Sequence, residues 1–128
     1  MKMTIEWNGK KYEIDDNQRV IITEDRGQIA AILYMPGLPT HIIINLSGPH
    51  PAWNWNGDAV NPTFSPSILT RLPWGQERQE IRNHVFVRNG MIQYLGDCTH
   101  EYAGKTIELP RLCDWPDDMK LWEDPACC

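Results

Sequence analysis

Apolar and polar residues alternate most clearly between residues 82 and 97. Two runs with a period of two, RNHVFVR and MIQYLGD, are joined there by Asn89-Gly90. This dipeptide tolerates the positive φ angles of a two-residue type I′ turn, so the pattern predicts a β-hairpin. The turn also fixes the pairing of the two strands, and Arg82 is expected to lie opposite Asp97.

Side chains alternate between the two faces of a strand, so this pairing divides the hairpin into two faces. We expect one face to lie in the core, and it carries Val85, Val87, Ile92 and Tyr94. The opposite face carries Arg82, His84, Phe86, Gln93, Leu95 and Asp97. On that face His84 and Asp97 are diagonal neighbours, about 7–8 Å apart at the backbone and within reach of each other's side chains.

The same alternation, interrupted by turns, runs through most of the chain. Residues 3–14 repeat the hairpin pattern around Asn8-Gly9. Further β-rich runs occupy residues 18–22, 28–34, 40–46 and 67–71. This density of β-branched residues, with a turn signal about every 8–12 positions, predicts a mainly β protein: a small single domain of antiparallel hairpins.

Proline and tryptophan concentrate between residues 36 and 74. Bulky aromatic side chains need burial, so we expect this Pro/Trp-rich segment to form an ordered loop layer that packs over the sheet. Trp53, Trp55 and Trp74 would then be the core of that layer. The alternative is an aromatic and amide platform that binds a ligand.

The domain is expected to span the whole chain. Its parts are N-terminal strands at 1–50, a motif-rich region at 51–110 and an acidic tail at 111–128. In the tail we expect a short C-terminal helix with Asp114 or Asp117 as its N-cap. Its apolar face would carry Trp115, Met119 and Trp122.

The chain is acidic, with a formal net charge of −5 and an isoelectric point near 5.3. A general nucleic-acid binder needs a positive field to displace counterions from phosphates, so we expect no general nucleic-acid binding. The N-terminus has no apolar run of signal-peptide length, and nowhere do about 18 apolar residues follow one another. These features predict a cytoplasmic protein that does not enter membranes.

The sharpest chemical signal lies at the open end of the predicted central hairpin. Cys98 and His100, in the run DCTH, follow Asp97 there and approach His84. Imidazole, carboxylate and thiolate bind transition metals, and two histidines with one carboxylate leave coordination positions open for water. We therefore predict a metal site for zinc, or else iron or manganese. Its candidate ligands are His84, His100, Asp97, Cys98 and His50.

The two residues of the Asp97-Cys98 pair are expected to differ in role. Cys98 should project to the face opposite Asp97, which makes Cys98 the better core residue and Asp97 the better partner of His84. A β-bulge at Gly96 would reverse this assignment. The alternative to a functional site is a sheet histidine that is hydrogen-bonded to Asp97, with His100 in a simple turn.

A serine nucleophile is the second chemical hypothesis. Ser65 or Ser67, in the run TFSPS, would be activated by His84 or His100 and oriented by Asp97. Serines beside a proline more commonly satisfy the backbone of a turn. The chain also has no Gly-x-Ser-x-Gly nucleophile elbow. On the sequence alone, the serine route therefore ranks below the metal route.

Several motifs together resemble a known family. They are WNWNGD, NPTFSPSI and NHVFVRNGMIQYLGDCTHEYAGKTIELP, between Trp53 and Pro110. The family comprises small proteins of phages and bacteria. Some carry a misleading ammonia monooxygenase label, and some are encoded beside bacterial ubiquitin-like conjugation genes. The resemblance implies a metal-dependent or otherwise hydrolytic peptidase. Relatives have Cys-His where this chain has Asn83-His84, so a cysteine that serves as a ligand in relatives would be missing here.

These observations predict a metal-binding small hydrolase, a peptidase that acts on a protein substrate. The metal would polarise the scissile carbonyl and lower the pKa of its bound water, with Asp97 or Asp58 as the base. The rival hypothesis is a non-catalytic phage accessory protein that binds a host protein, with the metal structural or absent. An open coordination position beside a carboxylate favours the enzyme, whereas four closed protein ligands favour the binding protein.

Overall fold

The structure is a computed structural model that describes residues 1–48 and 52–122. β-Strands dominate these ranges, which confirms the predicted mainly β class, and they contain no α-helix. In chain order the elements are β1 (Lys2–Trp7), β2 (Lys10–Asp15), β3 (Ile21–Asp25), β4 (Gln28–Leu33), β5 (Ile42–Asn45), β6 (Asn54–Trp55), β7 (Phe64–Trp74), β8 (Gln79–Arg88), β9 (Met91–Tyr94), β10 (Thr106–Glu108), η1 (Leu112–Asp114) and η2 (Asp117–Met119).

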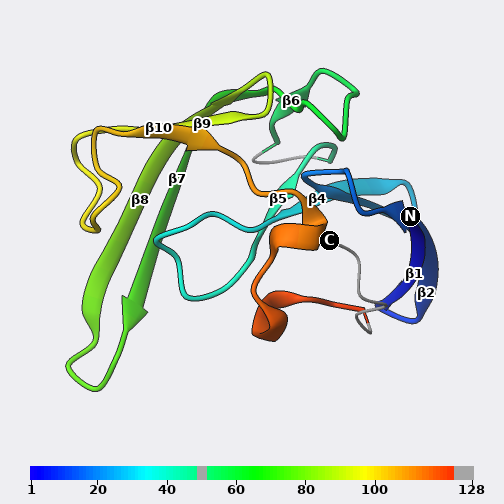
Figure 1. Ribbon diagram of the computed structural model, residues 1–128, viewed down its shortest axis with the longest axis horizontal. Coiled ribbons are helices and arrows are strands. Elements are labelled where there is room, and N and C mark those ends of the chain that lie inside the picture. The colour runs from blue at the N-terminus through cyan, green and yellow to red at the C-terminus, as the bar shows by residue number, and fades with distance from the viewer. Residues whose placement is uncertain (49–51, 123–128) are drawn as a thin grey trace.

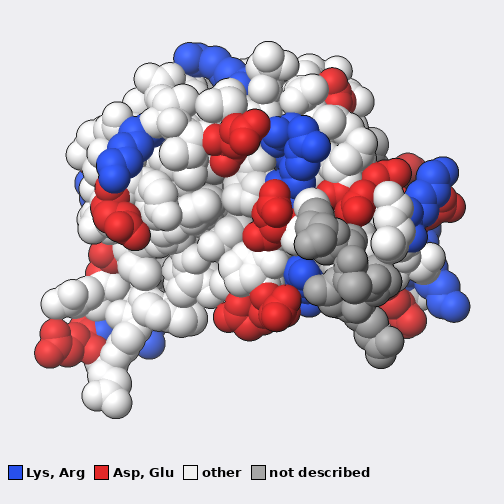
Figure 2. Space-filling model, in the orientation of Figure 1, with Lys and Arg blue, Asp and Glu red and all other residues white. Residues whose placement is uncertain are grey.

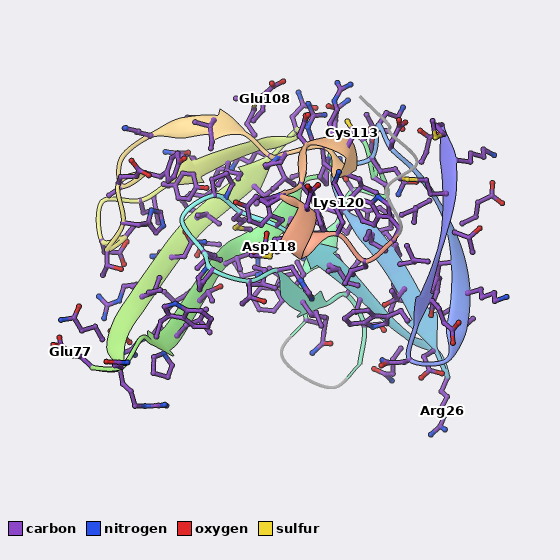
Figure 3. The ribbon with its side chains drawn as sticks, turned by 60° about the horizontal axis from the view of Figure 1, so that its bottom comes forward. Arg26, Glu77, Glu108, Cys113, Asp118 and Lys120 are labelled. Atoms are coloured by element: carbon purple, nitrogen blue, oxygen red, sulfur yellow. The ribbon has the colours of Figure 1, made fainter. Side chains whose placement is uncertain are left out.

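The described strands form three antiparallel sheets (Figure 1). The strand orders are β1-β2, β3-β4-β5 and β10-β9-β8-β7-β6. β7 and β8 form a long hairpin that extends away from the body of the molecule (Figure 1). In Figure 3 the end of this hairpin, marked by Glu77, and the β3–β4 turn, marked by Arg26, lie on opposite sides of the molecule.

Both Asn-Gly turns form as predicted. Asn89 and Gly90 have φ angles of 48° and 76°, and Asn8 and Gly9 have φ angles of 51° and 78°. Next to the first of these turns, β8 and β9 pair in the register that the turn fixes. The predicted core face of this hairpin is buried. The local pattern therefore determines the central hairpin.

The predicted pairing of Arg82 with Asp97 is wrong. β9 ends before that point, and a turn follows in which Cys98 donates its N–H to the Leu95 carbonyl at 3.2 Å. The turn takes up extra residues, so the carbonyl of Arg82 accepts the N–H of Thr99 at 3.0 Å. Asp97 is thereby left within the turn itself.

The three-stranded sheet lies between two hydrophobic clusters. Side chains alternate along its strands, so neighbouring residues face opposite sides. Ala31 and Leu33 belong to the first cluster, whereas Ile21 and Ile32 belong to the second. The first cluster also contains the buried face of the five-stranded sheet, and the second is closed by β1, β2 and the tail.

The Pro/Trp-rich segment is more regular than predicted. Its last part is β7, a strand of 11 residues where a short strand after a loop was expected. Trp53 and Trp55 are partly buried against the first cluster, as predicted. Trp74 is 53% exposed, because it lies near the tip of the β7–β8 hairpin and away from the core.

The tail forms two short 3-10 helices where one helix was expected. Their N-cap residues are Arg111 and Pro116, so neither Asp114 nor Asp117 is the predicted cap. The predicted apolar face is nevertheless buried in the second cluster. It comprises Trp115, Met119 and Trp122.

None of the helices in the described ranges has the length and apolar character needed to cross a membrane. On the face drawn in Figure 2, Lys and Arg side chains are interspersed with Asp and Glu side chains. This face therefore presents a mixture of charges rather than a broad patch of one sign.

Candidate active site

Three neighbouring segments of the five-stranded sheet bring a serine, a histidine and an aspartate together. Ser67 lies on β7, His84 on β8 and Asp97 in the turn after β9. The Oγ of Ser67 is 3.0 Å from the Nε2 of His84. The Nδ1 of His84 is 3.2 Å from the Oδ2 of Asp97. The imidazole therefore bridges the hydroxyl and the carboxylate.

The pairing of β7 with β8 explains how Ser67 reaches His84. Leu69 lies directly opposite His84. Ser67 precedes Leu69 by two positions, so the three side chains share one face of the sheet. The register shifts between Phe64 and Ile68, in the segment that contains the serine. Such bulges re-aim side chains and occur often beside active sites.

Trp53 holds the backbone of Ser67. Its indole Nε1–H donates to the Ser67 carbonyl at 3.2 Å. Its backbone N–H donates to the carbonyl of Asn45, the last residue of β5, at 2.8 Å. Trp53 thus connects the serine to the three-stranded sheet. Nothing in the sequence marks Trp53 for this role, because its two partners are fixed only by the packing of one sheet against the other.

The turn that carries Asp97 is fastened to the backbone of His84. Leu95 donates its N–H to the His84 carbonyl at 2.9 Å. The Sγ of Cys98 lies 3.3 Å from the backbone nitrogen of His84. Cys98 is buried, so the predicted placement of Cys98 in the core and of Asp97 beside His84 is confirmed.

These hydrogen bonds select one tautomer of His84. An ionised Asp97 only accepts hydrogen bonds, so Nδ1 carries the proton and Nε2 accepts from the Ser67 hydroxyl. The side chains of His84 and Asp97 are 27% and 44% exposed, so solvent reaches the pair. A hydroxyl, a base and a carboxylate in this order can carry out nucleophilic acyl transfer.

His100 lies on the opposite side of the sheet from His84. Its Nε2 is 2.7 Å from the Oδ1 of Asn83. Asn83 is fully buried and precedes His84 on β8, so the two side chains point to opposite faces. The ring of His100 also packs against Tyr94 and Tyr102. The structure therefore does not bring the two histidines together.

Of the other candidate residues, the structure describes Asp58 and Ser65. Asp58 accepts hydrogen bonds from the backbone N–H groups of Asn61 and Val60, and these bonds hold the pKa of its carboxyl below the usual value. Ser65 is exposed on β7. His50 lies outside the described residues. Within residues 1–48 and 52–122, no three His, Cys, Asp or Glu side chains gather closely enough to hold a metal ion.

A cleft of about 410 Å³ opens beside the serine. Residues 40–44 line one wall, residues 68–72 line the other, and Trp53 also lines it. The cleft adjoins Ser67, because the second wall begins at the next residue and Trp53 binds the Ser67 carbonyl. The cleft therefore begins one residue after Ser67 along β7.

A family model described as "BubE: Bacterial ubiquitination-like system serine protease" matches residues 6–95. The match includes Ser67 and His84 and ends just before Asp97. It begins far upstream of Trp53, so it also covers the N-terminal strands that the motif resemblance left out. No curated protein and no solved structure shows a significant match to the chain.

Proposed function

Because the chain belongs to the BubE family of serine proteases from bacterial ubiquitination-like systems, we propose that it is a serine peptidase. Ser67 is the nucleophile, His84 is the general base and Asp97 orients the imidazole. The observation that carries this proposal is the continuous pair of hydrogen bonds from Ser67 Oγ through His84 to Asp97 Oδ2. The substrate is a protein, since the family is described as one of proteases.

The reaction follows from these positions. Ser67 Oγ attacks the scissile carbonyl carbon while His84 Nε2 takes the hydroxyl proton. The protonated His84 then gives this proton to the leaving amine, the C–N bond breaks, and an acyl ester remains on Ser67. Water attacks the ester with His84 again acting as the base, and the carboxylic acid and the free serine are released. Throughout, Asp97 stabilises the imidazolium through its Nδ1–H bond.

The geometry reverses the ranking that the sequence suggested. A metal ion bound by His84 needs one of the two ring nitrogens. Both nitrogens already have partners, Ser67 on one side and Asp97 on the other. The serine route uses the side chains where they lie, whereas the metal route requires them to separate. We therefore place the serine route first.

A serine-directed fluorophosphonate probe tests the proposal. The wild-type protein should be labelled at Ser67, and the Ser67→Ala variant should not be labelled. Ser65→Ala is the matched control, because Ser65 lies in the same strand but is exposed and has no hydrogen bond to a histidine in the described structure. Wild-type protein that stays unlabelled would contradict the proposal and favour the accessory binding protein, whereas equal labelling of folded Ser67→Ala would contradict the assignment of Ser67 as the nucleophile.

Elemental analysis tests the metal prediction separately. Protein purified without a histidine tag would have to contain stoichiometric zinc, iron or manganese for the metal route, and His84→Ala or His100→Ala would have to remove most of it. The serine route instead expects fluorophosphonate labelling that is unchanged after treatment with a chelator. The two results separate the mechanisms because the probe reacts with the hydroxyl and the chelator removes only the metal.

A further inference from the structure

The walls of the cleft beside Ser67 are the edges of two strands. Five consecutive residues of β7, 68–72, line one wall, and residues 40–44, which include the start of β5, line the other. Consecutive side chains of a strand point to opposite faces of the sheet. A wall that is lined by five consecutive residues is therefore formed by the backbone edge of the strand and not by one of its faces. Backbone N–H and C=O groups are therefore exposed to the cleft.

The edge of β7 is open along this wall. The short strand β6 pairs only with Phe64 and Ser65, and the described part of the chain places no strand beside residues 68–72 on that side. His84 accepts the N–H of Leu95, so the backbone polar groups of His84 point toward β9. Leu69 lies opposite His84 in the antiparallel pair. Because the polar groups of His84 point away from β7, these two residues form a pair that is not hydrogen-bonded, and the N–H and C=O of Leu69 point away from β8 and toward the cleft.

The positions of two other residues of β7 are consistent with this orientation of the backbone groups. Arg71 follows Leu69 by two positions, so its backbone groups also point to the open edge. Pro73 comes two positions later, opposite Glu80. Proline is tolerated in a strand where its missing N–H would face an open edge, and this is the direction that the alternation assigns to Pro73.

The facing edge, on β5, likewise has no neighbouring strand among the residues that the structure describes. The Asn45 carbonyl points away from β4, because it accepts the N–H of Trp53. Ile43 precedes Asn45 by two positions, so its backbone polar groups point the same way, toward the cleft. The side chains of Ile43 and Leu69 are 51% and 50% exposed, and they stand at the two walls. The cation that lines the cleft, Arg71, is paired with Glu80. The cleft thus offers apolar side chains and unpaired backbone groups.

We propose that the cleft binds an extended, apolar segment of the protein substrate as an added β-strand on the edge of β7. The backbone of this segment bonds to the N–H and C=O of Leu69, and its apolar side chains pack on Ile43 and Leu69. The added strand leads to Ser67, because Ile68 begins the wall and Trp53 joins the wall to the serine. Strand addition of this kind obtains affinity from main-chain bonds and selectivity from alternate side chains. This inference rests on the proposed peptidase function, and it restricts the substrates to unfolded segments.

The test uses an acetylated peptide of alternating threonine and valine as the probe. Increasing concentrations of this peptide should slow the labelling of Ser67 by the small fluorophosphonate, because the peptide covers the serine. Single backbone nitrogens of the peptide are then methylated one at a time. Methylation at every second residue should raise the peptide concentration needed for protection by about tenfold, and methylation at the residues between should have little effect. This period of two is specific to a bound β-strand, since only alternate N–H groups face β7.

Variants of Leu69 test the same contact from the protein side. Leu69→Pro removes the N–H that points into the cleft, so the peptide concentration needed for protection, measured relative to labelling of the same variant without peptide, should rise by about tenfold or more. Leu69→Val keeps the N–H and should retain most of the protection. Absence of protection in the wild type would overturn the inference, and so would N-methyl effects without a period of two. If Leu69→Pro does not fold, the series of N-methylated peptides tests the contact on the wild-type protein. Failure of labelling without peptide would instead overturn the proposed peptidase function, and anisotropy of a fluorescent peptide would still report strand binding.

Discussion

The carboxylate of Asp97 accepts a hydrogen bond from His84 at 3.2 Å, although His84 lies on β8 and Asp97 lies beyond the end of β9. A turn after β9 creates this contact, and Cys98 binds that turn to the His84 backbone. The buried thiol thus has a positioning role. The exposed carboxylate beside it determines which nitrogen of the imidazole carries the proton.

Asp97→Asn should reduce the rate of fluorophosphonate labelling and of peptide cleavage by about 10²–10⁴-fold. The amide of asparagine can donate to Nδ1, which places the imidazole proton on Nε2 and prevents His84 from accepting the Ser67 proton. Stability should change little, because the Asp97 side chain is 44% exposed. The labelling rate and the denaturation midpoint, measured on the same sample, separate the two effects.

Asp58→Asn is the matched control for this substitution. Asp58 was the other base predicted from the sequence, but its carboxylate accepts N–H groups of its own turn. The labelling rate of Asp58→Asn should therefore equal that of the wild type. A loss of labelling at Asp58 comparable to that at Asp97 would contradict the assignment of Asp97 as the orienting carboxylate.

The two Asn-Gly turns provide a matched pair for stability. Gly9 and Gly90 have similar φ angles, 78° and 76°. An added Cβ would meet nothing within 4 Å at Gly9, whereas at Gly90 it would lie 3.1 Å from the Oδ1 of Asn61 and 3.4 Å from Arg19. Gly9→Ala should cost about 1 kcal/mol through backbone strain. Gly90→Ala should lower the free energy of unfolding further, and equal losses in urea denaturation would show that the contact with Asn61 relaxes freely.

Arg19 is a buried cation that connects distant parts of the chain. Its Nε donates to the Leu109 carbonyl at 2.8 Å, and its Nη1 donates to the Val60 carbonyl at 2.6 Å. Arg19→Leu leaves these acceptors without their donor, so we expect a loss of about 3 kcal/mol or more in the free energy of unfolding. Arg111→Leu, at an exposed position, should change stability by less than about 0.5 kcal/mol in the same denaturant titration. Similar losses in both variants would contradict the role assigned to Arg19.

Local signals predicted the hairpins, but the contacts between distant strands decided the site. Neighbouring residues determine both the turn at Asn89-Gly90 and the alternation around it. The register of β8 with β9 could therefore be predicted from the sequence. No local sequence pattern identifies the strand that pairs with β7. Ser67 reaches His84 only because β7 pairs with β8 and bulges between Phe64 and Ile68, and this information lies in the packing.

The placement of His100 shows a second limit of sequence patterns. His84 and His100 are close in the sequence, and the predicted metal site assumed that the chain folds back on one face. In the structure His100 bonds to Asn83, whose side chain faces the core because neighbouring strand residues alternate. The position of Asn83 was visible in the pattern, but the turn that brings His100 to it depends on tertiary contacts with Arg82 and His84.

The buried ring of His100 makes the stability of the protein depend on pH. Burial lowers the pKa of His100, and Glu101 opposes this effect only in part. The hydrogen bonds give the same direction: Tyr102 donates its N–H to Nδ1 at 3.2 Å, so Nδ1 accepts and the neutral ring donates from Nε2 to Asn83. A second proton would place an N–H on Nδ1 against the N–H of Tyr102. The folded state therefore favours neutral His100.

The sign of the pH effect follows from this preference. The unfolded chain binds the His100 proton near the usual pKa of about 6.5, whereas the folded protein binds it only at lower pH. The contribution of His100 to stability is thus fully present above that value and is lost as the pH falls through the folded pKa. Urea titrations from about pH 8 to pH 5 should show the free energy of unfolding decreasing, with a smaller decrease in His100→Gln. Burial also lowers the pKa of His41. The free energy of unfolding of a double variant, His41→Gln with His100→Gln, should therefore change even less with pH. A His100→Gln curve parallel to that of the wild type would show that protonation of His100 does not oppose folding.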